Sequence, residues 1–483
     1  MKFVIVGAGM GGLAAALRLS HGGHRVTVLE KTGMIGGRNR PVKVNECRFD
    51  GGPTLLMMLD PFRKLFADVG ERFEDHLQLE LLDPSYTAWY RDGSRIQGTP
   101  DKARMAEQIE LLCGSEDAEG YRQLLRDLEA MYQEAMPRFV QRNYYKAAHF
   151  LNPDSLRSAA RHGMLGNLAR RIERYVQDPR LRMLFSFQTM YLGLSPFESP
   201  WVYAVLTYME YGEGIWYPQG GLVEIAHVIA KLAEARGAEI RLDTEAAFIE
   251  GKTVELVDGQ TLDADAVIVN ADLPYAEREL LGLKPARRRK FSCSAYAMYV
   301  DYCGELPALG HHSVFFGEDF RGNLEQIFNR RELPSDPAFY AAVSCRSDPG
   351  AAPEGHENLF LLVPCANLDR NWTQDDADTL RARAFQRLAA EAGFDEDKIA
   401  GFKDYGPQDY AGELNLERGA AFGLSHHFSQ SAFFRPSNRS RQNPYVYFVG
   451  ASTVPGNGLP MVLISAELLE ERLNRELGAA QLR

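Results

Sequence analysis

The sequence predicts an α/β fold, and three observations between Lys2 and Glu30 support this prediction. Residues 2–6 (KFVIV) are apolar and largely β-branched, as expected for a buried strand. Glycines follow at positions 7, 9 and 12 in a G-x-G-x-x-G frame, and an Ala/Leu-rich helix continues to Ser20. A second apolar run, residues 25–29, ends on Glu30. A strand, a glycine turn, a helix, a strand and an acid in this order are typical of a Rossmann-like unit that binds a dinucleotide.

The residue types in this unit have physical reasons. Gly7 permits the tight turn, Gly9 lets backbone N–H groups approach a pyrophosphate, and Gly12 lets the helix pack closely on the strand. The helix N-terminus offers unpaired N–H donors. Glu30 can accept hydrogen bonds from an adenosine ribose and disfavours the 2′-phosphate of NADP. The predicted dinucleotide site consists of Gly7, Ala8, Gly9, Met10, Gly11, Gly12, Glu30 and Lys31.

A second glycine cluster favours FAD as the dinucleotide. Gly37 and Arg38 follow the ribose acid closely, and the run DGGPT occupies residues 50–54. Arg38 would supply a forked donor to the FAD pyrophosphate, and Gly51-Gly52 would bring backbone close to a flat ring. The alternatives are a surface arginine after a turn and an ordinary glycine turn.

The composition indicates a large globular chain. Its 483 residues are 45% hydrophobic and 25% charged, which excludes a disordered or collagen-like chain. The net charge of −11 argues against a general nucleic-acid binder, so no nucleic-acid partner is expected. The six cysteines show no C-x-x-C spacing, which argues against a zinc or dithiol site and favours a reducing compartment. No apolar run reaches the roughly 18–20 residues of a membrane-spanning helix.

Motifs along nearly the whole chain resemble the FAD-dependent carotenoid desaturases of the bacterial phytoene desaturase type, within the amine-oxidase-like flavoprotein superfamily. The N-terminal motifs mark only the superfamily. The more specific ones are GIWYPQGG at 214–221, HHSVFFGEDF at 311–320, FRPSN at 434–438 and VGASTVPGNG at 449–458. The resemblance implies an FAD cofactor and a linear carotenoid precursor of the phytoene or diapophytoene type. It also implies hydride transfer to flavin N5, with a proton lost from the adjacent carbon.

The resemblance further assigns flavin contacts beyond the first glycine motif. These are Gly37, Arg38, Thr54, Leu55, Ala246, Gly450, Met461 and Val462. For Gly450, Met461 and Val462, ordinary core packing is the alternative. One departure from the family is visible, because relatives often carry S/T-H-P-G near the C-terminus. Val454 stands before Pro455-Gly456 here, so any role of that histidine is absent from this position.

The resemblance also implies a discontinuous domain organisation. Residues 1–85, 211–283 and 443–483 are expected to form the Rossmann-like FAD-binding domain. Residues 284–442 are expected to form an interleaved α+β substrate-binding domain with a mixed sheet, and 86–210 a helical substrate- or membrane-facing region. The local patterns agree, with an amphipathic helix at 222–236, strands at 238–242 and 266–270, and a hairpin around Asp258-Gly259.

A basic and aromatic segment lies inside this acidic chain. Residues 137–183 contain ten Arg or Lys and three acids, a local charge of +7, interleaved with Phe, Tyr and Leu. Such a segment favours an anionic membrane surface, on which it would lie without spanning the bilayer. The alternative is a solvated helix face that pairs with the acidic stretch 101–134. Together with the resemblance, the segment predicts a cytoplasmic protein attached peripherally to the membrane. The sequence indicates no oligomeric state.

Candidate catalytic residues are few. Asp154 is expected to cap a helix after Asn152-Pro153, and with Arg157 it resembles an Asp/Arg pair considered catalytic in related desaturases. The pairs His311-His312 and His426-His427 are not expected to bind metal, because adjacent strand residues point to opposite faces. No metal site is therefore predicted.

The predicted function is desaturation of a linear carotenoid precursor by an FAD-dependent oxidoreductase. The alternatives are a carotenoid isomerase, saturase or oxygenase, an amine oxidase, and a flavin-free lipid-handling protein like the GDP dissociation inhibitors. No cysteine follows Cys365, which excludes flavin attachment to a C-terminal cysteine, and the intact glycine motif argues against a flavin-free protein.

Overall fold

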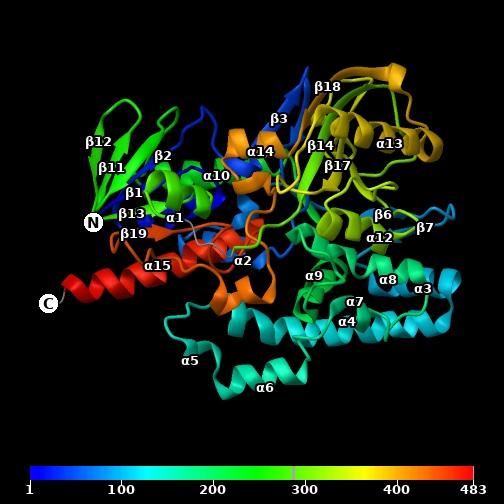
Figure 1. The fold of residues 1–483 in the computed structure, drawn as a ribbon, viewed down its shortest axis with the longest axis horizontal. Coiled ribbons are helices and arrows are strands. Elements are labelled where there is room, and N and C mark those ends of the chain that lie inside the picture. The colour runs from blue at the N-terminus through cyan, green and yellow to red at the C-terminus, as the bar shows by residue number, and fades with distance from the viewer. Residues whose placement is uncertain (285–288, 482–483) are drawn as a thin grey trace.

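Five parallel strands form the sheet at the left of Figure 1, which carries the glycine motif. The computed structural model describes residues 1–284 and 289–481. The strand order is β19-β13-β1-β2-β9, and neighbouring strands pair in parallel. The bounds are β1 Lys2–Val6, β2 Arg25–Leu29, β9 Glu239–Arg241, β13 Ala266–Val269 and β19 Val446–Phe448. The predicted α/β fold and its nucleotide-binding sheet are therefore present.

Both faces of this sheet are covered, and the alternation along β1 explains how. Phe3 and Ile5 join the core formed with helices α1, α10 and α15. Val4 and Val6 join a second core on the opposite face, under a three-stranded antiparallel sheet. The helices are α1 Met10–His21, α10 Val223–Glu234 and α15 Leu459–Gln481, and the small sheet is β10 Ala246–Glu250, β11 Thr253–Leu256 and β12 Thr261–Asp263. The predicted helix at 222–236 and the hairpin around Asp258-Gly259 are confirmed.

A seven-stranded mixed sheet forms the upper right of Figure 1. The strand order is β18-β14-β17-β16-β15-β6-β7. Within the described residues, β15 and β6 pair in parallel, and all other neighbouring strands of this sheet are antiparallel. The bounds are β6 Tyr86–Trp89, β7 Arg95–Gly98, β14 Ser294–Cys303, β15 His312–Phe315, β16 Phe339–Val343, β17 His356–Cys365 and β18 Ile399–Tyr405.

Strands β6 and β7 correct the prediction that residues 86–210 form a helical region. Each strand is very short, too short for a clear periodic pattern. The parallel partner of β6 is β15, which begins only at His312, far from β6 along the chain. This pairing is a tertiary contact that no local pattern indicates.

The remaining part of 86–210 is helical, as predicted, and lies along the bottom of Figure 1, from the centre (α5 and α6) to the right (α3, α4, α7 and α8). Gly114, at φ +98°, separates the first two helices of this region. The bounds are α3 Lys102–Cys113, α4 Ser115–Ala135, α5 Ala147–Phe150, α6 Pro153–Arg161, α7 Leu168–Ile172, α8 Pro179–Leu184 and α9 Val205–Tyr208. Among the helices of the described residues, none combines the length and apolar character needed to cross a bilayer.

Shorter elements complete the fold. The helices are α2 Asp60–Asp68, α11 Leu273–Tyr275, α12 Phe320–Glu325, α13 Gln374–Ala392 and α14 Pro407–Leu414. Two small sheets pair β3 Pro41–Val44 with β4 Cys47–Asp50, and β5 Leu79–Leu81 with β8 Trp216–Pro218.

Candidate active site

The glycine turn between β1 and α1 requires its glycines for two different reasons. Gly7 has φ +103°, a conformation that L side chains rarely adopt. A Cβ atom on Gly12 would lie 2.1 Å from the Gly7 carbonyl oxygen. The turn therefore closes onto the first turn of the helix, and neither residue tolerates a side chain without a backbone shift.

Glu30, the first residue after β2, stabilises this turn through hydrogen bonds. One carboxylate oxygen accepts a hydrogen bond from the Ala8 backbone N–H at 2.9 Å. The other accepts from the Thr32 backbone N–H at 3.0 Å and from the Thr32 hydroxyl at 2.9 Å. Glu30 also lines the cavity above the turn.

A cavity of about 370 Å³ lies at the carboxyl ends of these strands. Most of the residues predicted to bind the dinucleotide line it, namely Gly7, Gly9, Met10, Gly11, Glu30, Lys31, Gly37, Arg38, Ala246, Gly450 and Val462. Ala8 and Gly12 do not line it and act through the shape of the turn. Thr54, Leu55 and Met461 line a second cavity instead.

Asn270 lies at the centre of the turn and is absent from the residues that the sequence predicts. Its side-chain amide donates to the Gly7 carbonyl oxygen at 3.3 Å. A Cβ atom on Gly9 or Gly11 would lie 2.8 Å from this amide, and one on Gly450 would lie 2.6 Å from it. Its position was the available signal, because it is the first residue after the parallel strand β13, at the sheet edge where α/β folds bind ligands.

Arg38 and Asp272 are two of the charged residues that line the same cavity. Burial lowers the pKa of Arg38, partly offset by Asp272. Burial likewise raises the pKa of Asp272, which accepts hydrogen bonds from the Ser452 hydroxyl at 2.5 Å and the Glu417 backbone N–H at 3.2 Å. A desolvated guanidinium in this position is well suited to a pyrophosphate.

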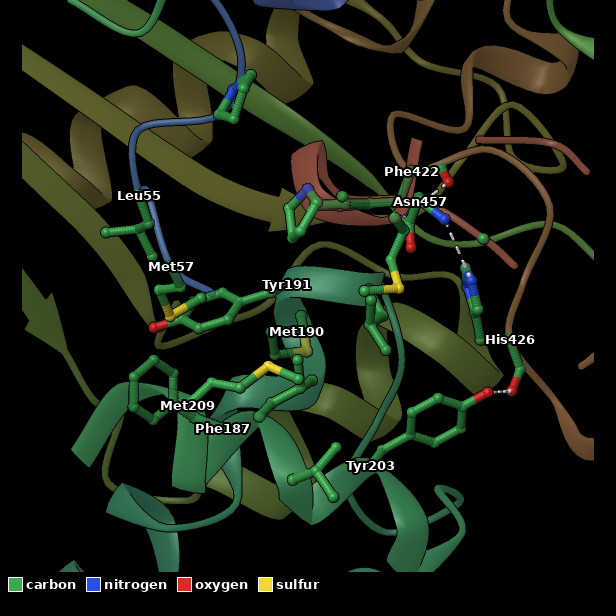
Figure 2. Close-up of a pocket in the computed structure, with 18 of the residues that line it drawn as sticks. Leu55, Met57, Phe187, Met190, Tyr191, Tyr203, Met209, Phe422, His426 and Asn457 are labelled. Atoms are coloured by element: carbon green, nitrogen blue, oxygen red, sulfur yellow. Dashed lines mark hydrogen bonds between the residues drawn. The ribbon is translucent and has the colours of Figure 1, made fainter. Parts of the chain in front are cut away.

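The second cavity is apolar and has a volume of about 420 Å³ (Figure 2). Methionine, leucine and aromatic side chains from distant parts of the chain surround it, and no charged side chain of the described residues lines it. Representative members are Leu55, Met57, Phe187, Met190, Tyr191, Tyr203, Leu206, Met209, Phe316, Tyr340 and Phe422.

The two cavities share one wall. Residues that line both are Gly52, Pro53, Tyr191, Leu362, Phe422, Asn457, Gly458 and Leu459. A group bound in the glycine-lined cavity would therefore meet a molecule in the apolar cavity at this wall, with no charged side chain between them.

The pair His311-His312 differs from the expectation that adjacent residues point to opposite faces. The rings of His311 and His312 lie 4.2 Å apart between centroids, because His311 precedes β15 and is not subject to the strand alternation. Burial lowers the pKa of both imidazoles. No group of three or more His, Cys, Asp or Glu side chains within the described ranges is arranged to hold a metal ion.

His426 lines the apolar cavity together with Pro455 and Gly456 of the turn that follows Val454. Its Nε2 accepts from the Asn457 backbone N–H at 3.4 Å, the contact drawn in Figure 2. Burial lowers the pKa of His426 well below its ordinary value, so the ring is neutral.

The structure does not bring Asp154 and Arg157 to either cavity. They form an ion pair of 3.0 Å with each other on the surface of α6, with side-chain exposures of 68% and 74%. The expected helix cap is corrected, because Asn152 is the N-cap and accepts from the Ser155 backbone N–H, while Asp154 lies within the first turn.

Similarity to known proteins agrees with this geometry. The family model for the flavin containing amine oxidoreductases matches residues 10–467. The chain belongs to this family. The predicted superfamily and FAD cofactor are thereby confirmed, and the protein is an FAD-dependent oxidoreductase.

Individual proteins agree with this assignment. The flavoprotein is 39% identical to the zeta-carotene-forming phytoene desaturase of Myxococcus xanthus, over 98% of this chain and 93% of that protein. It is 30% identical to a 4,4′-diapophytoene desaturase of Staphylococcus haemolyticus, over 99% of both. A solved oxidoreductase from Methanosarcina mazei matches 98% of this chain and 100% of that chain with a TM-score of 0.64 and 17% identity, which shows the fold alone.

Proposed function

We propose that the flavoprotein desaturates a linear carotenoid precursor. The observation that carries this proposal is the apolar cavity, which meets the glycine-lined cavity at a wall without charged groups. A polyene offers only apolar surface, and burying such surface contributes about 25 cal/mol per Å². The names of the relatives agree, and the higher identity to the phytoene desaturase favours a phytoene-type substrate over a diapophytoene type.

The chain's own residues hold FAD in this proposal. The Gly7–Gly12 turn and Arg38 bind the pyrophosphate, Glu30 binds the adenosine ribose, and Gly450 and Val462 approach the remaining part of the cofactor. When bound, FAD supplies the acceptor for the hydride that leaves the polyene. The apolar lining positions the allylic C–H bond at the shared wall and excludes water there. Thr54, Leu55 and Met461 act on the substrate side of this wall.

Two alternative functions fit the geometry less well. An amine oxidase of cationic substrates needs groups that stabilise an ammonium ion near the flavin, and the apolar cavity has no acidic side chain among the described residues. A flavin-free lipid-handling protein does not need Glu30, Arg38 and the crowded glycine turn. A carotenoid isomerase, saturase or oxygenase would use the same cavity. Only the reaction products distinguish these activities from desaturation.

The basic segment 137–183 is proposed to dock on an anionic membrane surface. Leu151, Leu156 and Leu165 are each more than half exposed. Phe139 and Val140 from the same segment line the apolar cavity, so the segment joins the surface to the substrate cavity. Among the described residues, the alternative pairing with the acidic stretch 101–134 involves only two Arg or Lys side chains of the segment, Arg138 and Arg161, which contact Glu134, as does His162. The domain boundaries and the cytoplasmic location stay predictions.

Anaerobic mixing with polyenes in liposomes tests the catalytic proposal. We expect phytoene to bleach the flavin absorbance while a longer polyene chromophore appears, and diapophytoene to react more slowly. Bleaching by amines but not by either polyene would identify an amine oxidase. A changed polyene without net flavin reduction would identify an isomerase.

Vesicle sedimentation tests the membrane proposal. Wild-type protein is expected to bind vesicles of phosphatidylglycerol with phosphatidylcholine, and to bind phosphatidylcholine alone weakly. The variant L151D/L156D/L165D should lose at least tenfold in vesicle affinity and keep its FAD. Leu111→Asp is the matched control, because Leu111 is exposed on α3 outside the segment. Equal binding by the triple variant and the control would refute docking through this segment.

A further inference from the structure

Glu210 is a buried carboxyl group that the proposed function does not yet use. It lies in the π-helical turn Met209–Glu213 and is 1% exposed. One oxygen accepts from the Tyr86 hydroxyl at 2.7 Å and from the Gln188 side-chain amide at 3.0 Å. The other accepts from the Tyr191 hydroxyl at 2.8 Å. None of these partners carries a charge, so the carboxylate is held by neutral hydrogen bonds alone.

Tyr191 connects this carboxyl group to the reaction site. It lies on the 3₁₀ turn Phe187–Leu192 and belongs to the wall shared by the two cavities. Figure 2 shows its side chain among those that surround the apolar cavity, near Met57 in this view. The chain thus places Tyr191 where substrate and cofactor would meet, with a carboxylate bonded to its hydroxyl group.

The hydroxyl groups of the other two tyrosines that line the apolar cavity have different hydrogen-bond partners. The Tyr203 hydroxyl donates to the His426 carbonyl oxygen at 3.0 Å. The Tyr340 hydroxyl contacts the Thr54 hydroxyl at 2.8 Å and His312 Nδ1 at 2.6 Å. Of these three tyrosines, only Tyr191 donates to a carboxylate. A tyrosine whose hydroxyl group donates to a carboxylate can transfer its own proton to that carboxylate while its oxygen accepts another proton from the cavity.

We propose that Tyr191 and Glu210 together accept the proton that leaves the substrate during desaturation. This inference rests on the desaturase function proposed above. The C–H bond next to the site of hydride loss breaks, and its electron pair becomes the second bond of the new C=C. The proton binds to Tyr191 Oη, and the former hydroxyl proton of Tyr191 passes to Glu210 Oε2. The other C–H bond breaks with both electrons leaving as the hydride, which goes to the flavin. Charge and electrons therefore balance.

The surroundings of Glu210 suit this role. Burial raises its pKa to about 7, opposed by the hydrogen bonds from Tyr86, Gln188 and Tyr191. The titratable groups that face it are Tyr86 on β6, Tyr191, and Tyr211, whose hydroxyl adjoins that of Tyr86. Burial raises the pKa of all three tyrosines well above the ordinary value, so they stay neutral. Glu210 is therefore the group of this cluster that changes charge near neutral pH.

The test uses three variants of the FAD-loaded enzyme. Tyr191→Phe removes the relay hydroxyl, and Glu210→Gln removes the proton acceptor while keeping its size. Tyr211→Phe is the matched control, because the Tyr211 hydroxyl adjoins that of Tyr86 but does not bond Glu210, and Tyr211 does not line the cavity. We expect the first two to lower the single-turnover rate of flavin reduction by phytoene at least 30-fold with unchanged FAD content. Tyr211→Phe should stay within about threefold of wild type.

A pH profile and infrared titration separate proton transfer from a structural role. The wild-type rate should rise through an apparent pKa near 7, and this rise should disappear in Glu210→Gln. Without substrate, the wild-type enzyme should show a protonated-carboxyl carbonyl band that titrates near pH 7 and is absent from Glu210→Gln. Equal rates and pH profiles in wild type, Tyr191→Phe and Glu210→Gln would overturn the relay. If the wild-type flavin is reduced by neither polyene, the desaturase proposal fails. The infrared titration then still decides on Glu210, because a carboxylate that stays ionised down to about pH 5 could not store the proton.

Discussion

The two cavities of this flavoprotein are built in different ways. The glycine-lined cavity has charged side chains in its wall, and many of its lining residues come from the segment between Val6 and Arg40, with Asn270 and Gly450 completing the turn. The apolar cavity draws its wall from residues between 52 and 461, and no two neighbouring motifs define it. One cavity is fixed by backbone geometry and the other by the sum of many side chains. Single substitutions should therefore abolish cofactor binding more readily than they abolish substrate binding.

The largest expected effect is at the glycine turn. Gly12→Ala would place a Cβ atom 2.1 Å from the Gly7 carbonyl oxygen, and two backbone segments would have to separate. We expect a cost of about 3 kcal/mol, or roughly a hundredfold loss of FAD affinity. Titration of apoprotein with FAD measures this. Gly412→Ala is the control, since Gly412 is also helical and its Cβ would meet no atom within 4 Å. Similar losses in both variants would contradict the argument.

The next effect concerns stability on the substrate side. The pKa of Glu210 is raised to about 7 in the folded protein, whereas an unfolded glutamate titrates near 4.3. Folding therefore takes up a proton between these values, and stability falls as pH rises through this window. Between about pH 5 and 8 the fall is up to about 2.5 kcal/mol. Denaturation of wild type and Glu210→Gln at about pH 5 and 8 should show a smaller decline for the variant. An equal decline in stability for wild type and Glu210→Gln would show that another group takes up the proton.

Glu30 tests the polar side of the same comparison. Glu30→Gln keeps the size but removes the charge that serves the turn and the ribose, so FAD affinity should fall by about 2 kcal/mol, or roughly 30-fold. Equilibrium binding of FAD gives the value. Glu239→Gln, at an exposed glutamate on the neighbouring strand β9, should leave it unchanged. A loss confined to turnover, with full FAD affinity, would be inconsistent with a ribose contact.

Leu206 tests the apolar side. Leu206→Asn is nearly isosteric and places an unpaired amide against the bound polyene, at a cost of about 1–2 kcal/mol. We expect kcat/KM for phytoene to fall roughly tenfold while FAD content and affinity stay constant. Leu111→Asn on the surface of α3, outside the basic segment, is the control. Reduced FAD affinity in the Leu206 variant would show that the cavities are not separable.

The smallest effect is expected at Asp154 and Arg157. Both side chains are exposed and pair with each other, and such surface pairs contribute about 0–1 kcal/mol. Asp154→Ala and Arg157→Ala should therefore keep turnover in detergent micelles within about twofold of wild type. A large loss of turnover with FAD retained would restore the catalytic role that the family resemblance assigns to them.

The predictions that succeeded rest on local physics. The strand at 2–6, the glycine turn, Glu30 and the hairpin at 258–259 each depend on residues close in sequence, and all are present. Two of the predictions that failed did so for different reasons. Strand β6 is set by its distant partner β15, and the cap of α6 is decided by which of two neighbouring polar residues, Asn152 or Asp154, reaches the helix backbone.

The sequence by itself determined the nucleotide cavity, because glycine spacing and a strand-terminal acid act through the local backbone. The tertiary structure decided everything that faces the substrate. It placed Thr54, Leu55 and Met461 on the apolar side of the shared wall. It also placed Asn270 in the glycine turn and Glu210 behind Tyr191. These contacts join segments that are not neighbours in the sequence, and burial gives them their chemistry, since desolvation shifts the pKa values of Arg38, Asp272 and Glu210.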